Sequence, residues 1–587
     1  MKNKSLKQIG LGLFIISVGL FISLSFVLNI NFKNSELKSL SQVKDEAFAK
    51  NLSELDPAPV IAMSEKLSKA IDKYNQVIVN EKGIKNKTVN EYFQNLNNDA
   101  SNFKTSQINE ENGFSGASAE KLREYTGWME GRSWANFSSF ETEFRRKVKD
   151  VNKSIISDLG IGESSRSQIK LNAMLIGAPD FLKSGWAALL IFGLAVIGGL
   201  IYFIPLMRKK PGIHNNHIYH NKSQTAKGPA IIVFILLVAF YIVLYQFPVY
   251  LTNQIALVEP LSQIMAGNAS SQWFLYGFLY SLSMLVMGVR MMIKYRGVKY
   301  QQVRTVSVIF FQLAFAFTLP QILTRLQLPS YDLKSAWPLE YSYFFDYRVD
   351  QYMEAGTLGL YMFFWGIILF AVGVPLLTYF YGKRWYCSWV CGCGGLAETV
   401  GDPYRHLSDK SLGAWKIERW LVHGVLVFAV VMTAWVAYTT FSGKAELLGI
   451  NSYSMRSTYV FFIGFVFAGA VGTGFYPVMG NRVWCRFGCP LAAYLGLVQR
   501  FKSRFRITTN GGQCISCGNC STYCEMGIDV RWYAQRGQNI IRSSCVGCGV
   551  CSAVCPRGVL KLENKTEKGR INDDPILIGR DRATLNL

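Results

Sequence analysis

The sequence predicts a mainly α-helical, polytopic membrane protein of about eight spans, with a helical domain between the first two spans and a small α+β domain near the carboxyl end. Three observations predict this architecture. Half of the 587 residues are hydrophobic, only 17% are charged, and all 13 cysteines fall in the stretch from Cys387 to Cys555. An average soluble protein has about 25% charged residues, so the composition excludes an ordinary soluble enzyme and a disordered chain.

The first predicted span covers Ile9 to Ile30 and follows three lysines. A helix needs about 20 apolar residues to cross a bilayer core. This run is too long for a signal peptide, and no small-residue cleavage site follows it. We therefore interpret residues 1–30 as a membrane anchor. Seven further apolar runs follow, at about 185–206, 229–251, 273–291, 305–323, 357–381, 420–441 and 458–478.

Lysine and arginine are distributed unevenly over the loops between these runs. Loops 208–228, 290–304 and 383–419 together carry 16 of them, whereas loops 252–271, 323–356 and 442–457 carry five. Cytoplasmic loops collect positive charge, so we expect an inner-membrane protein with its amino terminus and everything after residue 479 in the cytoplasm. Lipid is then a partner, and the net charge of +23 follows the topology rather than indicating nucleic acid.

Residues 31–184 form the predicted extracytoplasmic domain. Apolar residues recur there at helical spacing, in Val60, Met63, Leu67 and Ile71 and again in Phe144, Val148, Val151 and Ile155. The domain contains neither cysteine nor histidine, which excludes soft-metal sites and haem attachment. Ser115-Gly-Ala-Ser118 resembles the Ser-Gly-Ala-Thr stretch that carries covalent flavin in some respiratory membrane proteins, but a plain turn is the better interpretation, and we expect no flavin.

Eight cysteines form two runs of equal spacing within residues 506–563. The runs are Cys514-x2-Cys517-x2-Cys520-x3-Cys524 and Cys545-x2-Cys548-x2-Cys551-x3-Cys555. This spacing resembles that of bacterial two-cluster ferredoxins, in which the fourth cysteine of each run binds the other cluster. The resemblance implies two [4Fe–4S] clusters, one held by Cys514, Cys517, Cys520 and Cys555 and the other by Cys545, Cys548, Cys551 and Cys524. The alternative, a pair of zinc ribbons, does not call for eight thiolates in this spacing. Glu525 stands where the pattern expects proline, and it would place a carboxylate near a cluster.

Four more cysteines belong to an internal repeat. Gly382-Lys-Arg-Trp-Tyr-Cys387-Ser-Trp-Val-Cys391 matches Gly480-Asn-Arg-Val-Trp-Cys485-Arg-Phe-Gly-Cys489 at a constant offset of 98 residues. One copy lies in the 383–419 loop of the predicted bundle (185–479), and the other in the 480–505 linker. Residues four apart share a helical face, so we expect each CxxxC pair to present both sulfurs together. If the copies pack, four thiolates could hold a third iron–sulfur cluster, copper(I) or zinc, with Arg384 and Arg482 offsetting their charge. Reduced cysteines at a helix boundary are the alternative.

The region from about 357 to 560 resembles the polyferredoxin membrane proteins of the NosR/NapH/CcoG group, in which CxxxCP-type motifs precede a two-cluster ferredoxin domain. The resemblance implies cytoplasmic clusters that handle electrons for a respiratory system. The extracytoplasmic domain departs from the group, and the short 564–587 tail leaves no room for the immunoglobulin-like domain that ends CcoG.

These features predict an electron conduit between the cytoplasmic clusters and a membrane or extracytoplasmic respiratory partner, with quinone as a further candidate partner. The alternatives are a maturation factor that reduces or delivers copper to a respiratory enzyme, and a redox sensor. No P-loop or Rossmann fingerprint is present, which favours an electron-transfer subunit or accessory protein over a stand-alone enzyme. His214, His217 and His220 recur every third residue, and we interpret them as part of a solvated polar loop rather than as a metal site.

Overall fold

In the computed structural model, the described residues are 2–32, 46–97, 99–207, 216–218, 227–329, 332–442, 446–564, 576–578 and 583–585. The chain forms two units, one comprising Gly19–Leu189 with Phe247–Glu259 and the other comprising Met1–Val18, Leu190–Gln246 and Pro260–Leu587. The second unit, which we call the redox unit, contains every cysteine. Most of the predicted carboxyl-terminal tail, and His214 and His220, lie outside the described residues.

The smaller unit is built from α-helices around an aromatic core. Its elements are β1 (Asn29–Ile30), α3 (Glu46–Ser53), β2 (Ala58–Pro59), α4 (Val60–Lys82), α5 (Asn86–Asn95), α6 (Gly116–Thr126), α7 (Phe137–Leu159), α8 (Glu163–Ile176), α9 (Asp180–Lys183) and α12 (Thr252–Ala256). The two strands pair antiparallel, with Asn29 opposite Pro59. The predicted helical stripes are confirmed, because all eight of their residues are buried on α4 and α7.

The Ser115–Ser118 stretch is not a plain turn. It begins α6, where Ser115 precedes the first helical residue. The buried Ser118 hydroxyl donates to the Ser115 carbonyl oxygen at 2.9 Å. The local bond therefore serves to start a helix, which the short sequence pattern could not distinguish from a turn.

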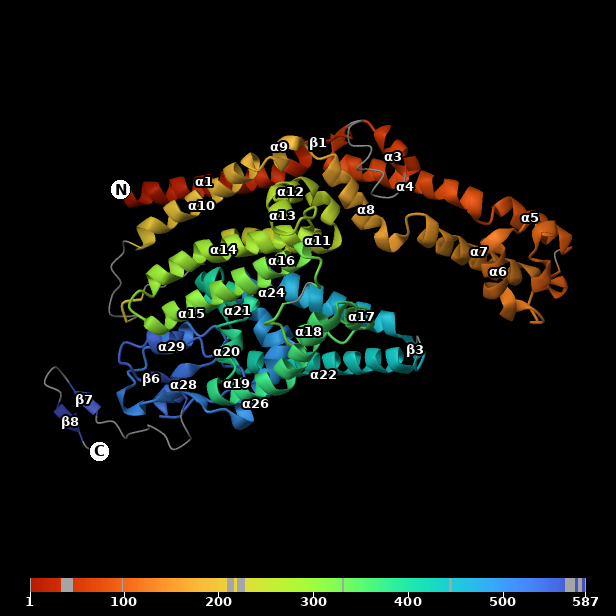
Figure 1. Ribbon diagram of the computed structural model, residues 1–587. Helices are drawn as coiled ribbons and strands as arrows, with labels where there is room; N and C mark the ends of the chain where they lie inside the picture. Colours follow the sequence, from red (N-terminus) through yellow and green to blue (C-terminus); the bar gives the residue numbers. More distant parts are fainter. Residues whose placement is uncertain are drawn as a thin grey trace. The chain divides into compact units, whose positions relative to one another are not determined.

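Eight helices among the described residues are long and apolar enough to cross a membrane, as predicted, and the protein is a multi-pass membrane protein. They are α1 (Lys2–Val27), α10 (Trp186–Met207), α11 (Lys227–Gln246), α14 (Gln272–Lys294), α15–η8–α16 (Lys299–Arg325), α18–η9–α19 (Gly356–Tyr381), α22 (Leu412–Ser442) and α23–η11–α24 (Ser452–Gly474) (Figure 1). Pro320 does not end its span, because a π-helical stretch, η8 (Phe311–Thr318), widens the helix just before it.

The segment 332–345, expected as part of an exposed loop, instead packs into the bundle of the redox unit. Trp337 stacks edge-on against Phe370 at 4.8 Å, and its indole nitrogen donates to the Thr433 hydroxyl at 3.0 Å. Ala336 and Phe345 belong to the same buried core as the repeat cysteines. Irregular backbone at membrane depth is stable where protein surrounds it, so the bundle accommodates this segment.

The carboxyl-terminal domain has the predicted α+β character. Strand β5 (Phe505–Thr509) pairs antiparallel with β6 (Leu560–Asn564), from Phe505 opposite Asn564 to Thr509 opposite Leu560. The three short helices α27 (Asn519–Thr522), α28 (Val530–Gln535) and α29 (Val550–Ala553) lie between the strands in sequence. The sheet thus closes a loop of chain that contains both four-cysteine runs, and the predicted fold class is confirmed.

Candidate metal centre

The first set of carboxyl-terminal cysteines gathers around one cavity. Cys514, Cys517, Cys520 and Cys555 all line it. Burial, together with the neighbouring thiols of Cys555, Cys517 and Cys514, raises the pKa of Cys520 to about 12. The structure therefore brings the fourth cysteine of the second run to the first three of the first run, which is the set that the ferredoxin resemblance implies.

The second set of carboxyl-terminal cysteines is more buried than the first. It consists of Cys545, Cys548, Cys551 and Cys524. Burial raises the pKa of Cys551 well above its usual value, and the thiols of Cys548, Cys524 and Cys545 act on it in the same direction. Gly518 and Gly549, which fall between the second and third cysteines of their runs, have φ angles of 79° and 74°. Each precedes a short helix that carries the next cysteine, so the left-handed turn aims that sulfur back at its partners.

The two repeat copies share one backbone path. Gly382 and Gly480 both have positive φ, 69° and 91°. The amide of Cys391 donates to the Tyr386 carbonyl at 2.7 Å, and that of Cys489 to the Trp484 carbonyl at 3.0 Å. The expectation that each CxxxC pair lies on one helical face is wrong, because α20 (Arg384–Cys387) and η12 (Trp484–Gly488) end before the second cysteine. That cysteine instead caps the next helix, α21 (Gly392–Thr399) or α26 (Pro490–Lys502).

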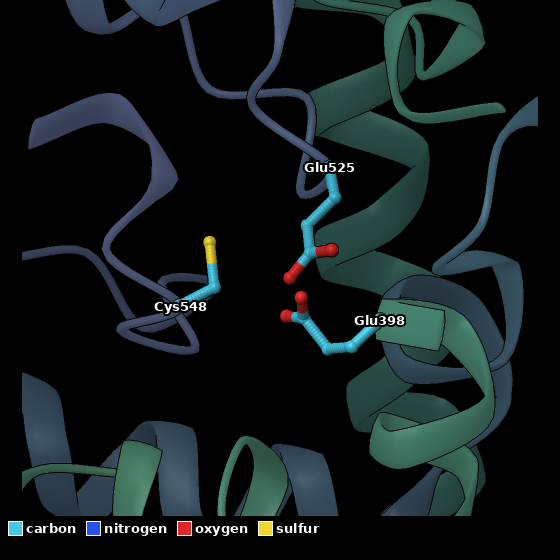
Figure 2. Close-up of side chains that lie close together, drawn as sticks. All are labelled: Glu398, Glu525 and Cys548. Carbon is cyan, nitrogen blue, oxygen red and sulfur yellow. The ribbon is translucent and has the colours of Figure 1, made fainter. Parts of the chain in front are cut away.

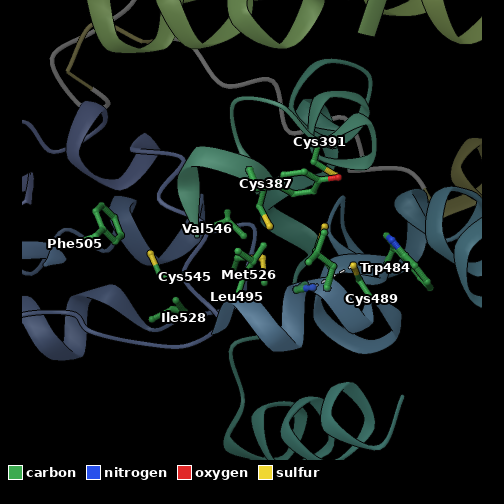
Figure 3. Close-up of a cluster of buried hydrophobic side chains, with 14 of the residues drawn as sticks. Cys387, Cys391, Trp484, Cys489, Leu495, Phe505, Met526, Ile528, Cys545 and Val546 are labelled. Atoms are coloured by element: carbon green, nitrogen blue, oxygen red, sulfur yellow. Dashed lines mark hydrogen bonds between the residues drawn. The ribbon is translucent and has the colours of Figure 1, made fainter. Parts of the chain in front are cut away.

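The turn nevertheless brings the four repeat cysteines together in one buried core, and each is less than 9% exposed (Figure 3). Burial raises the pKa of Cys387 to about 12, although the Lys383 ammonium opposes this. Burial also raises the pKa of Cys485 and Cys489, with neighbouring repeat thiols adding to the shift. A dry cluster of thiols that repel one another's charge is suited to a soft metal centre, since metal binding is what makes cysteine thiolates stable in such a place.

Each repeat brings one buried positive group close to these sulfurs. Arg482 Nη1 donates to Cys485 Sγ at 3.7 Å. Its counterpart Arg384 instead stacks over Phe505 at 4.8 Å and donates to Asn564 at 2.9 Å. Lys383, which sequence reasoning missed, is buried and donates to the carbonyls of Ala492 and Ser543. Its only signal in the sequence was its place next to the arginine that both repeat copies share.

Cys393 is a fifth thiol at this site. It forms a hydrogen bond with Cys391, and that bond is the main reason that the pKa of Cys391 falls to about 6. Burial and the same bond raise the pKa of Cys393 well above its usual value. Cys393 has no counterpart in the second repeat.

A buried charge network joins the repeats to the carboxyl-terminal domain. Glu398 pairs with Arg304 at 2.6 Å and Arg482 at 2.8 Å, and also with Arg405. Glu525 pairs with Arg405 at 2.7 Å and Arg482 at 3.0 Å. Burial opposes ionisation of Glu398, but the three arginines hold its pKa well below the usual range.

The two carboxylates point toward each other, and the Cys548 thiol faces them (Figure 2). The candidate ligand atoms of Glu398, Glu525 and Cys548 lie within 4.8 Å of one another. This group is not a cation site, because three guanidinium groups already neutralise the carboxylates. Glu525, which the sequence analysis expects near a cluster, thus brings a carboxylate within 4.8 Å of Cys548 Sγ. Sequence reasoning missed Glu398 and Arg405, although a glutamate inside the apolar 392–399 stretch was a signal.

A cavity of about 420 Å³ adjoins the repeat cysteines inside the bundle. Aromatic side chains, among them Tyr276, Tyr280 and Phe317, line it together with Cys393 and Cys485. Two of its lining residues, Asn481 and Trp484, each have a buried side-chain atom, Oδ1 and Nε1 respectively, without a hydrogen-bond partner in the part of the chain that the structure describes. Buried polar atoms of this kind are costly unless a ligand or water pairs with them.

Comparison with known families agrees with this geometry. A family described as a 4Fe-4S binding domain matches residues 363–413 and 460–508, which contain the two repeat copies. A family described as a 4Fe-4S dicluster domain matches residues 506–556. The carboxyl-terminal domain binds two [4Fe–4S] clusters. This ferredoxin domain contacts the repeats directly, for example through the Ser388 hydroxyl, which donates to the Val546 carbonyl at 2.7 Å.

Two distant relatives have names that refer to electron transport or to ferredoxin. YccM of Escherichia coli (strain K12), named as an electron transport protein, is 28% identical over 158 residues, which cover 25% of this chain and 43% of its own. The methylamine utilization ferredoxin-type protein MauN of Paracoccus denitrificans is 28% identical over 167 residues, which cover 26% of this chain and 53% of its own. The chain thus spans about half the length of these relatives. No solved structure matches the chain. The domains and the relatives together support a role in electron transport.

Proposed function

We propose that this protein is a membrane electron-transfer protein of the NosR/NapH/CcoG type, which passes electrons between the ferredoxin clusters and a respiratory partner in or beyond the membrane. The observation that carries the proposal is the convergence of Cys387, Cys391, Cys485 and Cys489 in one core with the ferredoxin cysteines. In this proposal the four repeat thiolates hold a third iron–sulfur cluster. The ferredoxin clusters take the ligand sets stated above, one completed by Cys555 and the other by Cys524.

The uneven loop charge supports the sidedness that we propose. The loops on the side of the ferredoxin domain carry 16 Lys and Arg, and those on the other side carry five. The ferredoxin domain and the amino terminus then face the cytoplasm, and the helical 31–184 domain faces the opposite side. Electrons would pass to or from a cytoplasmic carrier at the ferredoxin domain.

The cavity beside the repeat cysteines supports quinone as the membrane partner. A volume of about 420 Å³ between helices lies in the range of small-molecule sites, about 300–1,000 Å³. Trp484 Nε1 can donate to a quinone carbonyl, and Asn481 Oδ1 can accept from a quinol hydroxyl. A quinone takes up two electrons and two protons to become a quinol, so two single-electron transfers from the neighbouring centre complete the reaction.

A second candidate is a maturation factor that reduces or delivers copper, and the fifth thiol favours it. Cys393 shares a hydrogen bond with Cys391 and faces the cavity. Copper(I) accepts soft sulfur ligands, and a thiol outside the set of four could receive an ion that leaves the set.

Metal and sulfide analysis of anaerobically purified protein separates the two candidates. Three four-iron clusters require about twelve iron atoms per chain with matching acid-labile sulfide, whereas two clusters and a copper site give about eight iron atoms plus copper. Cys387→Ser combined with Cys485→Ser should remove one spectroscopic centre and leave the ferredoxin pair unchanged. Cys393→Ser is the matched control and should leave all three. An unchanged spectrum in the double variant would show that the repeat site holds no cluster.

A further inference from the structure

One cysteine of the ferredoxin domain is exposed to solvent. Of the 13 cysteines, all of which lie within described ranges, Cys517 alone is exposed. Cys514 and Cys555 are half-buried, and Cys520 is buried. Electron transfer between proteins requires the two redox groups to approach closely, so the edge around Cys517 is where a soluble partner comes nearest to a cluster.

Arginines surround this edge. Arg531 and Arg557 are exposed and line the same cavity as the four cysteines, and none of the described residues lining that cavity is acidic. Arg536, also exposed, holds its guanidinium 4.0 Å over the Trp532 ring. Ile515 is 58% exposed and Trp532 is 43% exposed, so the edge also offers apolar contact area.

Further cations lie around Trp532 and Tyr533 of α28. Trp532 and Tyr533 line a second cavity, of about 590 Å³, together with Lys410, Arg419, Arg500 and Arg542. Asp529 is the only carboxylate among its described lining residues. Among the described residues that line these two cavities, the cations are therefore not balanced by an acidic patch.

We propose that the basic edge formed by Ile515, Arg531, Trp532, Arg536 and Arg557 docks a small, acidic, soluble electron-carrier protein that bears a flavin or an iron–sulfur group. The proposal rests on the proposed function, because it names the partner of the ferredoxin domain. Opposite charge steers such partners together and fixes their orientation, and arginine and aromatic residues are enriched at protein interfaces. In the transfer itself, the reduced carrier loses one electron and the cluster gains it, and no covalent bond changes.

The test follows the rate at which purified flavodoxin hydroquinone, a small acidic carrier, reduces the full-length protein in detergent under anaerobic conditions. The variant Arg531→Glu/Arg557→Glu is compared with Arg296→Glu/Lys299→Glu, which makes the same change of charge at exposed positions near the start of α15. We expect the bimolecular rate constant of the first variant to fall about tenfold at low ionic strength, with the deficit shrinking as salt is added. The control should stay within about twofold of the wild type. Arg536→Glu, which does not line the cluster cavity, should show a smaller loss in the same direction.

Photoreduction by uncharged deazaflavin gives the comparison that needs no docking, and every variant should be reduced by it as the wild type is. If flavodoxin fails to reduce wild type that deazaflavin reduces, or if both charge-reversal pairs lose rate equally, the docking proposal is overturned while the proposed function stands. A deficit confined to vesicles of anionic phospholipid would assign the arginines to the bilayer and would also overturn it. Absence of any reducible cluster would overturn the proposed function itself.

Discussion

Arg482 should set the reduction potential of the iron–sulfur centre that we propose at the repeat cysteines. Its guanidinium is buried and donates to Cys485 Sγ at 3.7 Å, so it stabilises the electron that reduction adds. Replacing it in Arg482→Met removes that charge and leaves Glu398 and Glu525 less neutralised. Both effects make reduction harder, and the midpoint potential should become more negative.

The distance between Arg482 Nη1 and Cys485 Sγ sets the size of the expected shift in midpoint potential. Two unit charges 3.7 Å apart interact by about 4.5 kcal/mol at an effective dielectric constant of about 20. This is an upper value, because the added electron spreads over the whole centre, and doubling the separation halves the energy to about 2.2 kcal/mol. About 1.4 kcal/mol corresponds to about 59 mV for a one-electron couple, so we expect the potential to fall by about 100–200 mV.

The assay is a redox titration of anaerobically purified protein, monitored by electron paramagnetic resonance. It follows the signal that Cys387→Ser/Cys485→Ser removes. Arg384→Met is the matched control, since this residue occupies the same repeat position but faces Phe505 and Asn564. Its shift should be below about 30 mV, because exposed or distant charges are strongly screened.

The conservative variant Arg482→Lys separates charge from fold. It keeps a cation near Cys485 and should retain most of the wild-type potential, although it loses the forked geometry that serves two carboxylates. Equal shifts in Arg482→Met and Arg384→Met would refute the reasoning. So would an unshifted potential in Arg482→Met protein that retains its full iron content.

Three further predictions concern the frame of this site. Gly480→Ala should lower the free energy of unfolding by about 3 kcal/mol or more. The residue has φ 91° and ψ 176°, and its new Cβ would lie 2.3 Å from Ser408 Oγ. Thermal unfolding followed by circular dichroism measures the loss, and Gly12→Ala, whose new Cβ meets nothing within 4 Å, is the neutral control. Glu398→Gln should cost about 3–5 kcal/mol in the same measurement, since it leaves three buried arginines short of a partner, and a loss below about 1 kcal/mol would contradict the network. Trp484→Phe should leave stability unchanged but raise the KM for quinone about tenfold, which is the worth of one hydrogen bond. Trp389→Phe should not raise it, because the Trp389 indole donates to Tyr300 outside the cavity.

The sequence predicted the parts of this protein whose signal is local. Apolar length marks a span whatever surrounds it, and ferredoxin cysteine spacing is a property of one short stretch. The charge network was missed because Glu398 meets Arg304 and Arg482 only after stretches of chain that are far apart in the sequence have packed. Tertiary structure determines both whether Glu398 pairs with arginines and whether it is buried.

The internal repeat also shows that side-chain contacts could not be predicted from a local pattern. The 98-residue offset predicts that the two copies have equal backbones, and the backbones agree. The side chains do not, because the first copy packs against Phe505 of the ferredoxin strand while the second packs against Glu398 and Glu525. The 332–345 segment offers a comparable lesson. Trp337 packs against Phe370 and Thr433, which are distant in the sequence, so the burial of this segment also depends on tertiary structure.

The duplicated motif has a consequence for the origin of the chain. One copy supplies only two of the four converging sulfurs, and its glycine turn and helix cap are complete without the other. An ancestral polypeptide with a single copy would therefore assemble four sulfurs only as a homodimer, with the metal centre on the boundary between two identical halves. In the present chain the two copies differ, because the first carries the extra thiol of Cys393 and the second the buried guanidinium of Arg482.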